Sequence, residues 1–215
     1  MAVNDDVRKQ AVNGATPAVN GTGRRRIDYD VILNIVERKS RVLDLGCGSG
    51  DLLSLLIKTN QVIGYGMELE EEKVYDCIAR GLSVHHGDID DGLRDYPDHS
   101  FDYVILSLTL QAVRKPQFVI EEMLRVGTRA IVSFPNFAYL PIRLQLGLNG
   151  RMPVTSDLPY NWYDSPNIHH TTVKDFWSFC DESSIKVRDA HYFGSRGRVK
   201  TLPNLRAHSA LFVLE

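Results

Sequence analysis

A glycine-rich turn between an apolar strand and a helix constrains this chain more than any other feature. Residues 41–45 predict a strand, Gly46, Gly48 and Gly50 follow directly, and the apolar run at 52–58 predicts a helix. Such a turn lets backbone N–H groups approach a ligand closely. Its G-x-G-x-G spacing differs from the G-x-G-x-x-G of dinucleotide enzymes, and either pattern alone is a weak signal of ligand type.

Segments of strand and helix character alternate through most of the chain. Short runs rich in Val, Ile and Leu predict strands, and apolar residues three and four positions apart predict helices. Strands are expected at 41–45, 62–68, 82–86, 101–106 and 129–134, with helices at 27–36, 52–58, 70–80 and 117–125. This alternation predicts an α/β protein with a parallel sheet covered by helices on both faces.

The last part of the chain predicts two strands with no helix between them. They are expected at 185–193 and 207–214, after a helix at 173–181, and a turn-rich stretch joins them. Strands joined by turns pair antiparallel, so we expect an antiparallel pair at one edge of the sheet. The predicted fold is Rossmann-like, with a mostly parallel seven-stranded sheet.

Residues 135–170 form an insertion that interrupts the alternation after the fifth strand. They hold five prolines and the aromatic residues Phe137, Tyr139, Tyr160, Trp162 and Tyr163. Ligands of α/β proteins bind at the carboxyl edge of the sheet, which is where this insertion starts. We therefore expect it to serve as a lid or recognition surface.

The N-terminal residues differ in character from the rest. Residues 1–26 mix Asn, Ala, Gly, Thr and Val without a period, which predicts a disordered tail. The tail ends in Arg24, Arg25 and Arg26; a solvated run of charge is the preferred interpretation, and contact with an acidic partner is the alternative. Residues 27–215 have the length of a single domain with a full core.

Composition excludes several classes of protein. The net charge of −2 supplies no basic field for holding nucleic acid by its phosphates. Three widely spaced cysteines, Cys47, Cys77 and Cys180, predict neither a disulfide framework nor a zinc site, and no metal is expected. The apolar runs are too short to span a bilayer, and no secretory signal precedes them. We expect a cytoplasmic protein that binds neither membranes nor nucleic acid.

Acidic residues follow three successive predicted strands. Asp44 precedes the glycines, where it would repel a pyrophosphate and suit an ammonium beside a sulfonium. Glu68 can accept from both hydroxyls of a ribose, a role that serves a nicotinamide dinucleotide equally well. Asp88 is placed to accept from an adenine amino group, with Asp90 and Asp91 as competitors. Together they favour a cationic, adenosine-bearing ligand such as S-adenosylmethionine; its demethylated product S-adenosylhomocysteine, which lacks the sulfonium charge, is the alternative.

These stretches resemble class I S-adenosylmethionine-dependent methyltransferases, and within them the methionine biosynthesis protein MetW family. The general likeness rests on V-L-D-L-G-C-G-S-G at 42–50, Glu68, Gly87-Asp88 and F-D-Y-V-I at 101–105. The closer likeness rests on the stretches at 107–113, 129–137, 150–155 and 158–169. The cofactor contacts expected from motif and resemblance are Asp44, Gly46, Cys47, Gly48, Gly50, Glu68, Leu69, Asp88, Ile89 and Ser107.

The resemblance implies a role in methionine biosynthesis beside a homoserine O-acyltransferase, as a physical partner that supports it. It implies ligand binding more strongly than catalysis. The alternative hypothesis is an active methyltransferase acting on a small-molecule metabolite. A third hypothesis, a nicotinamide-dependent oxidoreductase, is supported only by the glycine turn and Glu68.

No catalytic residue is assigned from the sequence. Residues 107–109 lack the Asn-Pro-Pro-Tyr or Asp-Pro-Pro-Tyr of enzymes that methylate base amino groups, and Gln111 carries an amide, which is a poor base. His169 and His170 are the remaining candidate bases, and a structural role is the preferred interpretation of each.

Overall fold

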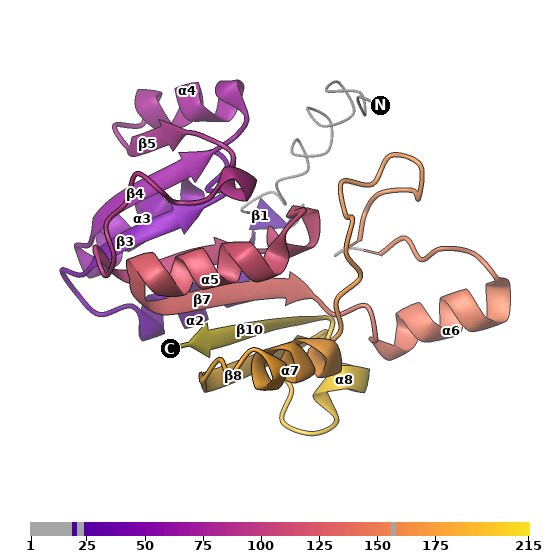
Figure 1. Ribbon diagram of the computed structural model, residues 1–215. Coiled ribbons are helices and arrows are strands. Elements are labelled where there is room, and N and C mark those ends of the chain that lie inside the picture. Colours follow the sequence, from indigo (N-terminus) through magenta and orange to yellow (C-terminus); the bar gives the residue numbers. More distant parts are fainter. Residues whose placement is uncertain (1–18, 21–23, 156–157) are drawn as a thin grey trace.

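A computed structural model describes residues 19–20, 24–155 and 158–215 (Figure 1). Most of the predicted tail, residues 1–26, lies outside the described residues, so its predicted disorder stays a prediction. The backbones of β1 (Val19–Asn20) and β2 (Arg24–Arg25) form a two-residue antiparallel pair. The helix α2 (Ile27–Ile35) begins the folded domain, one residue short of its predicted end.

An eight-stranded sheet in the order β5-β4-β3-β6-β7-β10-β8-β9 forms the centre of the domain. Its parallel part consists of β3 (Arg41–Leu45), β4 (Ile63–Glu68), β5 (Ser83–His86), β6 (Phe101–Ser107) and β7 (Gly127–Pro135). These strands match the predicted ones to within two residues. The Rossmann-like α/β prediction is confirmed.

The antiparallel strands lie on one side of this parallel part. The strand β10 (Ser209–Leu214) inserts between β7 and β8 (Val187–Gly194) and runs antiparallel to both. The expected antiparallel pair is therefore β8 with β10. An eighth strand of two residues, β9 (Gly197–Arg198), extends the edge beside β8, and so short a strand leaves no pattern in the sequence.

Helices cover both faces because strand residues alternate between two apolar clusters. On one face Tyr103 and Ile105 pack with α2 and with α3 (Asp51–Asn60). On the other face Val104 and Leu106 pack with α5 (Pro116–Val126) and α7 (Val173–Glu182). Further short elements complete the chain: α4 (Glu71–Ala79), η1 (Ile89–Asp91), η2 (Leu110–Ala112) and α8 (Pro203–Arg206).

The insertion after β7 contains a helix that the sequence analysis did not predict. This helix, α6 (Leu140–Asn149), projects away from the body of the domain (Figure 1). Pro141 lies in the first turn of α6, where the backbone N–H that proline lacks would have no partner within the helix. Gly150 ends the helix with a φ of 61°. Only Ile142 of α6 is buried.

Asn136 fixes the base of the insertion to the domain. Its side chain is fully buried, and its amide nitrogen donates to the carbonyls of Asn204 and Ala207 at 3.1 and 2.8 Å. Its amide oxygen accepts from the backbone N–H groups of Ala138 and Val173, both at 3.2 Å. One side chain thus joins the end of β7 to the start of α7 and to the loop before β10.

None of the helices within the described residues has both the length and the apolar character needed to cross a membrane.

Candidate cofactor-binding site

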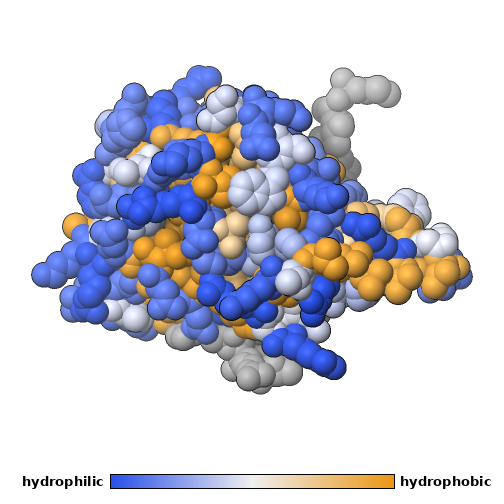
Figure 2. All heavy atoms as spheres, turned by 90° about the horizontal axis from the view of Figure 1, so that it is seen from below, coloured by the Kyte–Doolittle hydropathy of each residue, from blue (hydrophilic) through white to orange (hydrophobic). Residues whose placement is uncertain are grey.

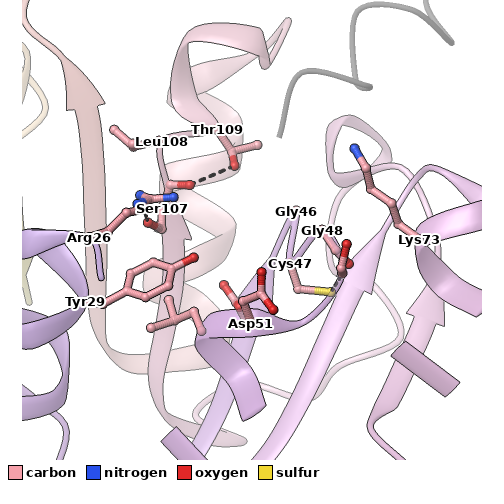
Figure 3. A pocket seen from close by; sticks show the side chains of 13 residues that line it. Arg26, Tyr29, Gly46, Cys47, Gly48, Asp51, Lys73, Ser107, Leu108 and Thr109 are labelled. Carbon is pink, nitrogen blue, oxygen red and sulfur yellow. Dashed lines mark hydrogen bonds between the residues drawn. The ribbon is translucent and has the colours of Figure 1, made fainter. Parts of the chain in front are cut away.

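A pocket that is open to solvent lies at the carboxyl ends of β3 and β6 (Figure 3). Four segments form it: the start of α2, the glycine turn with the start of α3, the helix α4, and the loop after β6. Of the ten predicted contacts, five line it, namely Asp44, Gly46, Cys47, Gly48 and Ser107. The other lining residues are Arg26, Tyr29, Ser49, Asp51, Leu52, Lys73, Leu108 and Thr109.

Gly46, Gly48 and Gly50 have φ angles of 64°, 57° and 76°, a region that residues with a side chain rarely adopt. A Cβ atom at Gly46 would also lie only 2.8 Å from Cγ2 of Thr109 across the pocket. The turn therefore needs glycine both for its conformation and for space. It leaves bare backbone on the pocket wall, as the sequence predicts.

Asp44 brings a buried carboxyl group to the floor of the pocket. The residue is 2% exposed, and burial raises the pKa of its side chain to about 7. The Arg26 guanidinium works against this rise, whereas the negative charge of Glu68 adds to it. A cationic ligand beside Asp44 would lower the pKa of its carboxyl group, because the positive charge stabilises the ionised form.

Arg26 is a pocket residue that the sequence analysis missed. It is 8% exposed, so the interpretation of the arginine run as solvated charge is wrong for this residue. Its guanidinium pairs with Asp28, donates to the hydroxyl of Ser107 at 3.0 Å and lies 4.6 Å from the centre of the Tyr29 ring. No local pattern marks it, because its burial arises where α2 meets β6.

Leu108 shows backbone strain on the pocket wall. Its φ is 53°, which is unusual for a residue with a branched side chain. The strain is held in place because its N–H donates to both the carbonyl and the hydroxyl of Ser133, each at 3.0 Å. Strained residues of this kind concentrate at functional sites.

Lys73 comes from α4 and lies on the side of the pocket opposite Arg26 (Figure 3). Its ammonium pairs with Glu70 at 2.6 Å. Lys73 was also missed from the sequence, where it reads as an ordinary charged residue on a helix.

Glu68 supports the glycine turn and does not line the pocket. Its carboxylate is 3% exposed and accepts three backbone N–H groups: that of Gly48 at 2.7 Å, and those of Leu69 and Glu70 at 3.0 Å. Its expected contact with a ribose stays a prediction. The geometry adds a structural role, because the same carboxylate holds the backbone N–H of Gly48, a residue of the pocket wall.

Asp88 lies outside the pocket lining, beside Arg114. Its carboxylate accepts from the N–H of Asp90 at 2.9 Å and pairs with the Arg114 guanidinium at 3.2 Å. Asp90, a competitor in the sequence analysis, is 5% exposed and accepts from the backbone N–H groups of Arg114 and Lys115, which is a structural role.

The remaining predicted contacts also lie outside the lining. Ile89 packs against the core cluster. Leu69 is 37% exposed, and its carbonyl lies 2.9 Å from the imidazole of His86. Gly50 starts α3 behind the pocket, where an added Cβ would lie 2.3 Å from Leu82.

Gln111 and His169 meet where the insertion rejoins the domain. The backbone carbonyl of Gln111 accepts from the N–H groups of Ile168 and His169 at 2.8 and 3.0 Å. Among the described residues, the buried Oε1 of Gln111 and the buried Nε2 of His169 are side-chain atoms without a hydrogen-bond partner. His170 instead packs edge-on against Phe137, with ring centres 4.4 Å apart, which is a structural contact.

The pocket residues offer complementary groups to an ammonium and to a carboxylate. Asp44 offers a carboxylate to an ammonium, and the Arg26 guanidinium offers donors to a carboxylate. The bare glycine turn lets a bulky ligand approach the backbone. Within the described residues, no group of three His, Cys, Asp or Glu side chains is arranged to hold a metal ion.

Solved structures with this architecture include proteins described as S-adenosylmethionine-dependent methyltransferases. A methyltransferase from Mesorhizobium loti described as S-adenosylmethionine-dependent has a TM-score of 0.64 and 17% identity, covering 94% of this chain and 99% of that one. One from Aquifex aeolicus has a TM-score of 0.61 and 14% identity, covering 100% and 99%. The [4+2]-cyclase SpnF has a TM-score of 0.67 and 16% identity, covering 98% and 92%. The fold is that of the class I methyltransferases, which hosts more than one reaction.

The sequence carries the identification further. Residues 26–214 match the family described as methionine biosynthesis protein MetW, and the chain belongs to that family. The bifunctional methionine biosynthesis protein MetXA/MetW of Rhodopirellula baltica is 34% identical over 208 residues, which cover 91% of this chain. The chain spans about a third of the length of that relative, 33%.

Proposed function

We propose that this protein binds S-adenosylmethionine or S-adenosylhomocysteine in the pocket and, in doing so, supports a homoserine O-acyltransferase of methionine biosynthesis. The observation that carries the first part is that Asp44 and Arg26 line the same pocket, beside the bare glycine turn. In this proposal the carboxylate of Asp44 holds the ligand's ammonium and Arg26 holds its carboxylate. The cofactor itself would supply an electrophilic methyl group on a sulfonium.

The relative from Rhodopirellula baltica supports the second part. Its description joins MetXA and MetW in one bifunctional protein. Fusion into one chain keeps two domains at a high local concentration relative to each other. Two separate proteins reach the same proximity when they form a complex. We therefore propose that this chain contacts its acyltransferase through its own surface.

The projecting helix α6 offers an apolar surface for such a contact. Leu140, Leu144 and Leu148, four positions apart along one side of the helix, are 40%, 48% and 79% exposed, and we call them the leucine stripe. Trp162 and Tyr163, further along the insertion, are 76% and 71% exposed. Figure 2 shows apolar side chains along the projecting part. Exposed apolar patches of this kind mark interaction sites.

Two measurements on the full chain test the proposal. Titration calorimetry with S-adenosylmethionine, S-adenosylhomocysteine and NAD tests the pocket; binding of NAD alone would favour an oxidoreductase instead. Co-purification with the acyltransferase, and its activity with and without this protein, test the partnership. Absence of a complex together with unchanged acyltransferase activity would contradict the second part.

One observation favours a second candidate, a methyltransferase acting on a small metabolite. The Oε1 atom of Gln111 has no hydrogen-bond partner, and Gln111 follows the pocket residue Leu108 by three positions. The Nε2 atom of His169, at the base of the insertion, also has no partner. They could orient a hydroxyl or amino group of an acceptor. Transfer of labelled methyl groups into a metabolite extract tests this candidate, and repeated absence of labelled product would contradict it.

A further inference from the structure

Two of the three cysteines form a thiol pair beside the pocket. Cys47 lies in the glycine turn and is partly exposed, whereas Cys77 lies on α4 with 0% exposure. The two thiols are close enough for each to influence the pKa of the other. Both thiols also lie against one backbone oxygen, that of Gly48, at 3.7 Å for Cys47 and 3.2 Å for Cys77.

The space around this pair admits little besides the two sulfur atoms. A Cβ atom at Gly66 would lie 2.7 Å from the sulfur of Cys47, and one at Gly50 would lie 2.9 Å from the sulfur of Cys77. Cβ atoms do not approach other atoms so closely without displacing them. The absence of side chains at these two glycines therefore leaves room for the two sulfur atoms.

The pair connects α4 to a backbone unit of the pocket wall. Gly48 lines the pocket, its carbonyl accepts from both thiols, and its N–H donates to Glu68 at 2.7 Å. A covalent bond between Cys47 and Cys77 would change the position of the Gly48 backbone in the pocket wall.

We propose that Cys47 and Cys77 are a modification site at which a hydroperoxide forms a reversible disulfide, and that closing the disulfide lowers the affinity of the pocket for S-adenosylmethionine. The second half of this inference rests on the proposed function, and the first half does not.

The oxidation balances with a hydroperoxide as the only co-reactant. One thiol attacks hydrogen peroxide, the O–O bond breaks, and the sulfur becomes a sulfenic acid as one water leaves. The second sulfur attacks the sulfenic sulfur, the S–S bond forms, and a second water leaves. The two sulfurs lose two electrons, and both thiol protons depart in the two waters.

The geometry provides access and a partner for this chemistry. Cys47 lines the pocket, so a small oxidant reaches it from solvent. The Cys77 thiol contacts the same Gly48 carbonyl oxygen as Cys47, so it lies beside the oxidised sulfur and is placed to resolve the sulfenic acid.

Closing the bond should disturb the turn because a disulfide is much shorter than a non-bonded contact between two sulfur atoms. The S–S distance is about 2 Å, so the two sulfurs must approach each other and the glycine turn must follow. Cys180 serves as an internal control. It is buried on α7, away from this pair, and burial raises its pKa to about 11.

The test uses the full chain and two matched variants, Cys77→Ala and Cys180→Ala. Each protein is treated with hydrogen peroxide, and intact mass with peptide mapping identifies any disulfide. Calorimetry then measures S-adenosylmethionine affinity before oxidation, after oxidation and after reduction with dithiothreitol. We expect wild type and Cys180→Ala to form the Cys47–Cys77 bond and to lose affinity by roughly tenfold or more, reversibly. The Cys77→Ala variant should form no such bond.

Each outcome decides a separate part of the inference. If no Cys47–Cys77 bond forms in wild type, the modification site is wrong. If the bond forms and affinity is unchanged, the coupling to the pocket is wrong. If the reduced protein binds neither S-adenosylmethionine nor S-adenosylhomocysteine, the proposed function fails, while the mass measurement still decides whether the site exists.

Discussion

Arg26 and Asp44 line one pocket with opposite charges, and the guanidinium of Arg26 lowers the pKa of Asp44 against the effect of burial. The two residues come from separate segments, the chain just before α2 and the strand β3. A ligand that carries both an ammonium and a carboxylate complements this pair. The first two predictions follow from it.

We expect the affinity for S-adenosylmethionine to fall as the pH decreases through about 7, because the Asp44 carboxyl then becomes neutral. Asp44→Asn should weaken binding above this pH by roughly 1–3 kcal/mol and flatten the pH dependence. Calorimetric titration over the pH range around neutrality measures both effects.

The exposed Asp181→Asn on α7 is the matched control and should bind as wild type does. A flat wild-type profile across neutral pH would contradict the assignment of Asp44. The ligand-free protein should show a related effect on stability. The pKa of Asp44 in the folded protein lies above its ordinary value of 3.8. Asp44 therefore contributes fully to the free energy of unfolding below pH 3.8, and this contribution is lost as the pH rises through about 7.

Arg26→Ala should weaken S-adenosylmethionine binding by roughly 1–3 kcal/mol, since a charge-assisted contact to the ligand's carboxylate is lost. The substitution also removes the partner of Asp28, so stability must be measured separately. A decarboxylated analogue of the ligand distinguishes the two effects. It should lose far less affinity than S-adenosylmethionine does, and equal losses for both ligands would mean that Arg26 acts only through the fold.

Glu68→Ala should lower the free energy of unfolding of the ligand-free protein by roughly 1–3 kcal/mol, because backbone N–H groups such as that of Gly48 lose their acceptor. Denaturant titration without ligand measures this change. Glu72→Ala, an exposed acid on α4, should change it little. If Glu68→Ala reduced only ligand affinity, its role in supporting the turn would be wrong.

Asn136→Ala should destabilise the protein by roughly 2–5 kcal/mol, since four hydrogen bonds are lost and buried backbone groups remain unpaired. Equilibrium unfolding monitored by circular dichroism measures the loss. The exposed Asn161→Ala in the same insertion is the control. A loss no larger than that of the control would show that the insertion does not depend on Asn136.

The double substitution Leu144→Asp, Leu148→Asp should abolish co-purification with the acyltransferase and leave S-adenosylmethionine affinity unchanged. Both leucines are exposed on α6, outside the pocket lining, so charge there disfavours an apolar contact without reaching the ligand. Ile78→Asp on α4, also an exposed apolar residue, is the control and should co-purify normally. Equal recovery of all three proteins would exclude the leucine stripe as the contact.

The sequence predicts the sheet well because strand patterns are local. The strand at 41–45 coincides with β3, and the buried run at 101–106 matches β6 to one residue. The helix α6 was missed since the five prolines of the insertion suggest irregular structure, although Pro141 occupies a position in the helix that tolerates proline.

The site was only partly predictable because side-chain direction depends on tertiary contacts. The glycine turn and Asp44 follow from spacing alone. Arg26 follows from no local pattern, since contacts with Asp28 and with the distant Ser107 hold it in the pocket. Glu68 was assigned to ligand alone, whereas the N–H groups around it determine where its carboxylate points.

Arg26 stands between the short strand β2 and the helix α2, so the pocket shares a residue with the junction that leads into the domain. A ligand gripped by this side chain would fix the direction in which the upstream chain departs. By reciprocity, tension applied to that chain, as by a tethered neighbour, would change how tightly the ligand is held. Under the proposed function, ligand binding and the path of the chain at this junction would therefore be coupled.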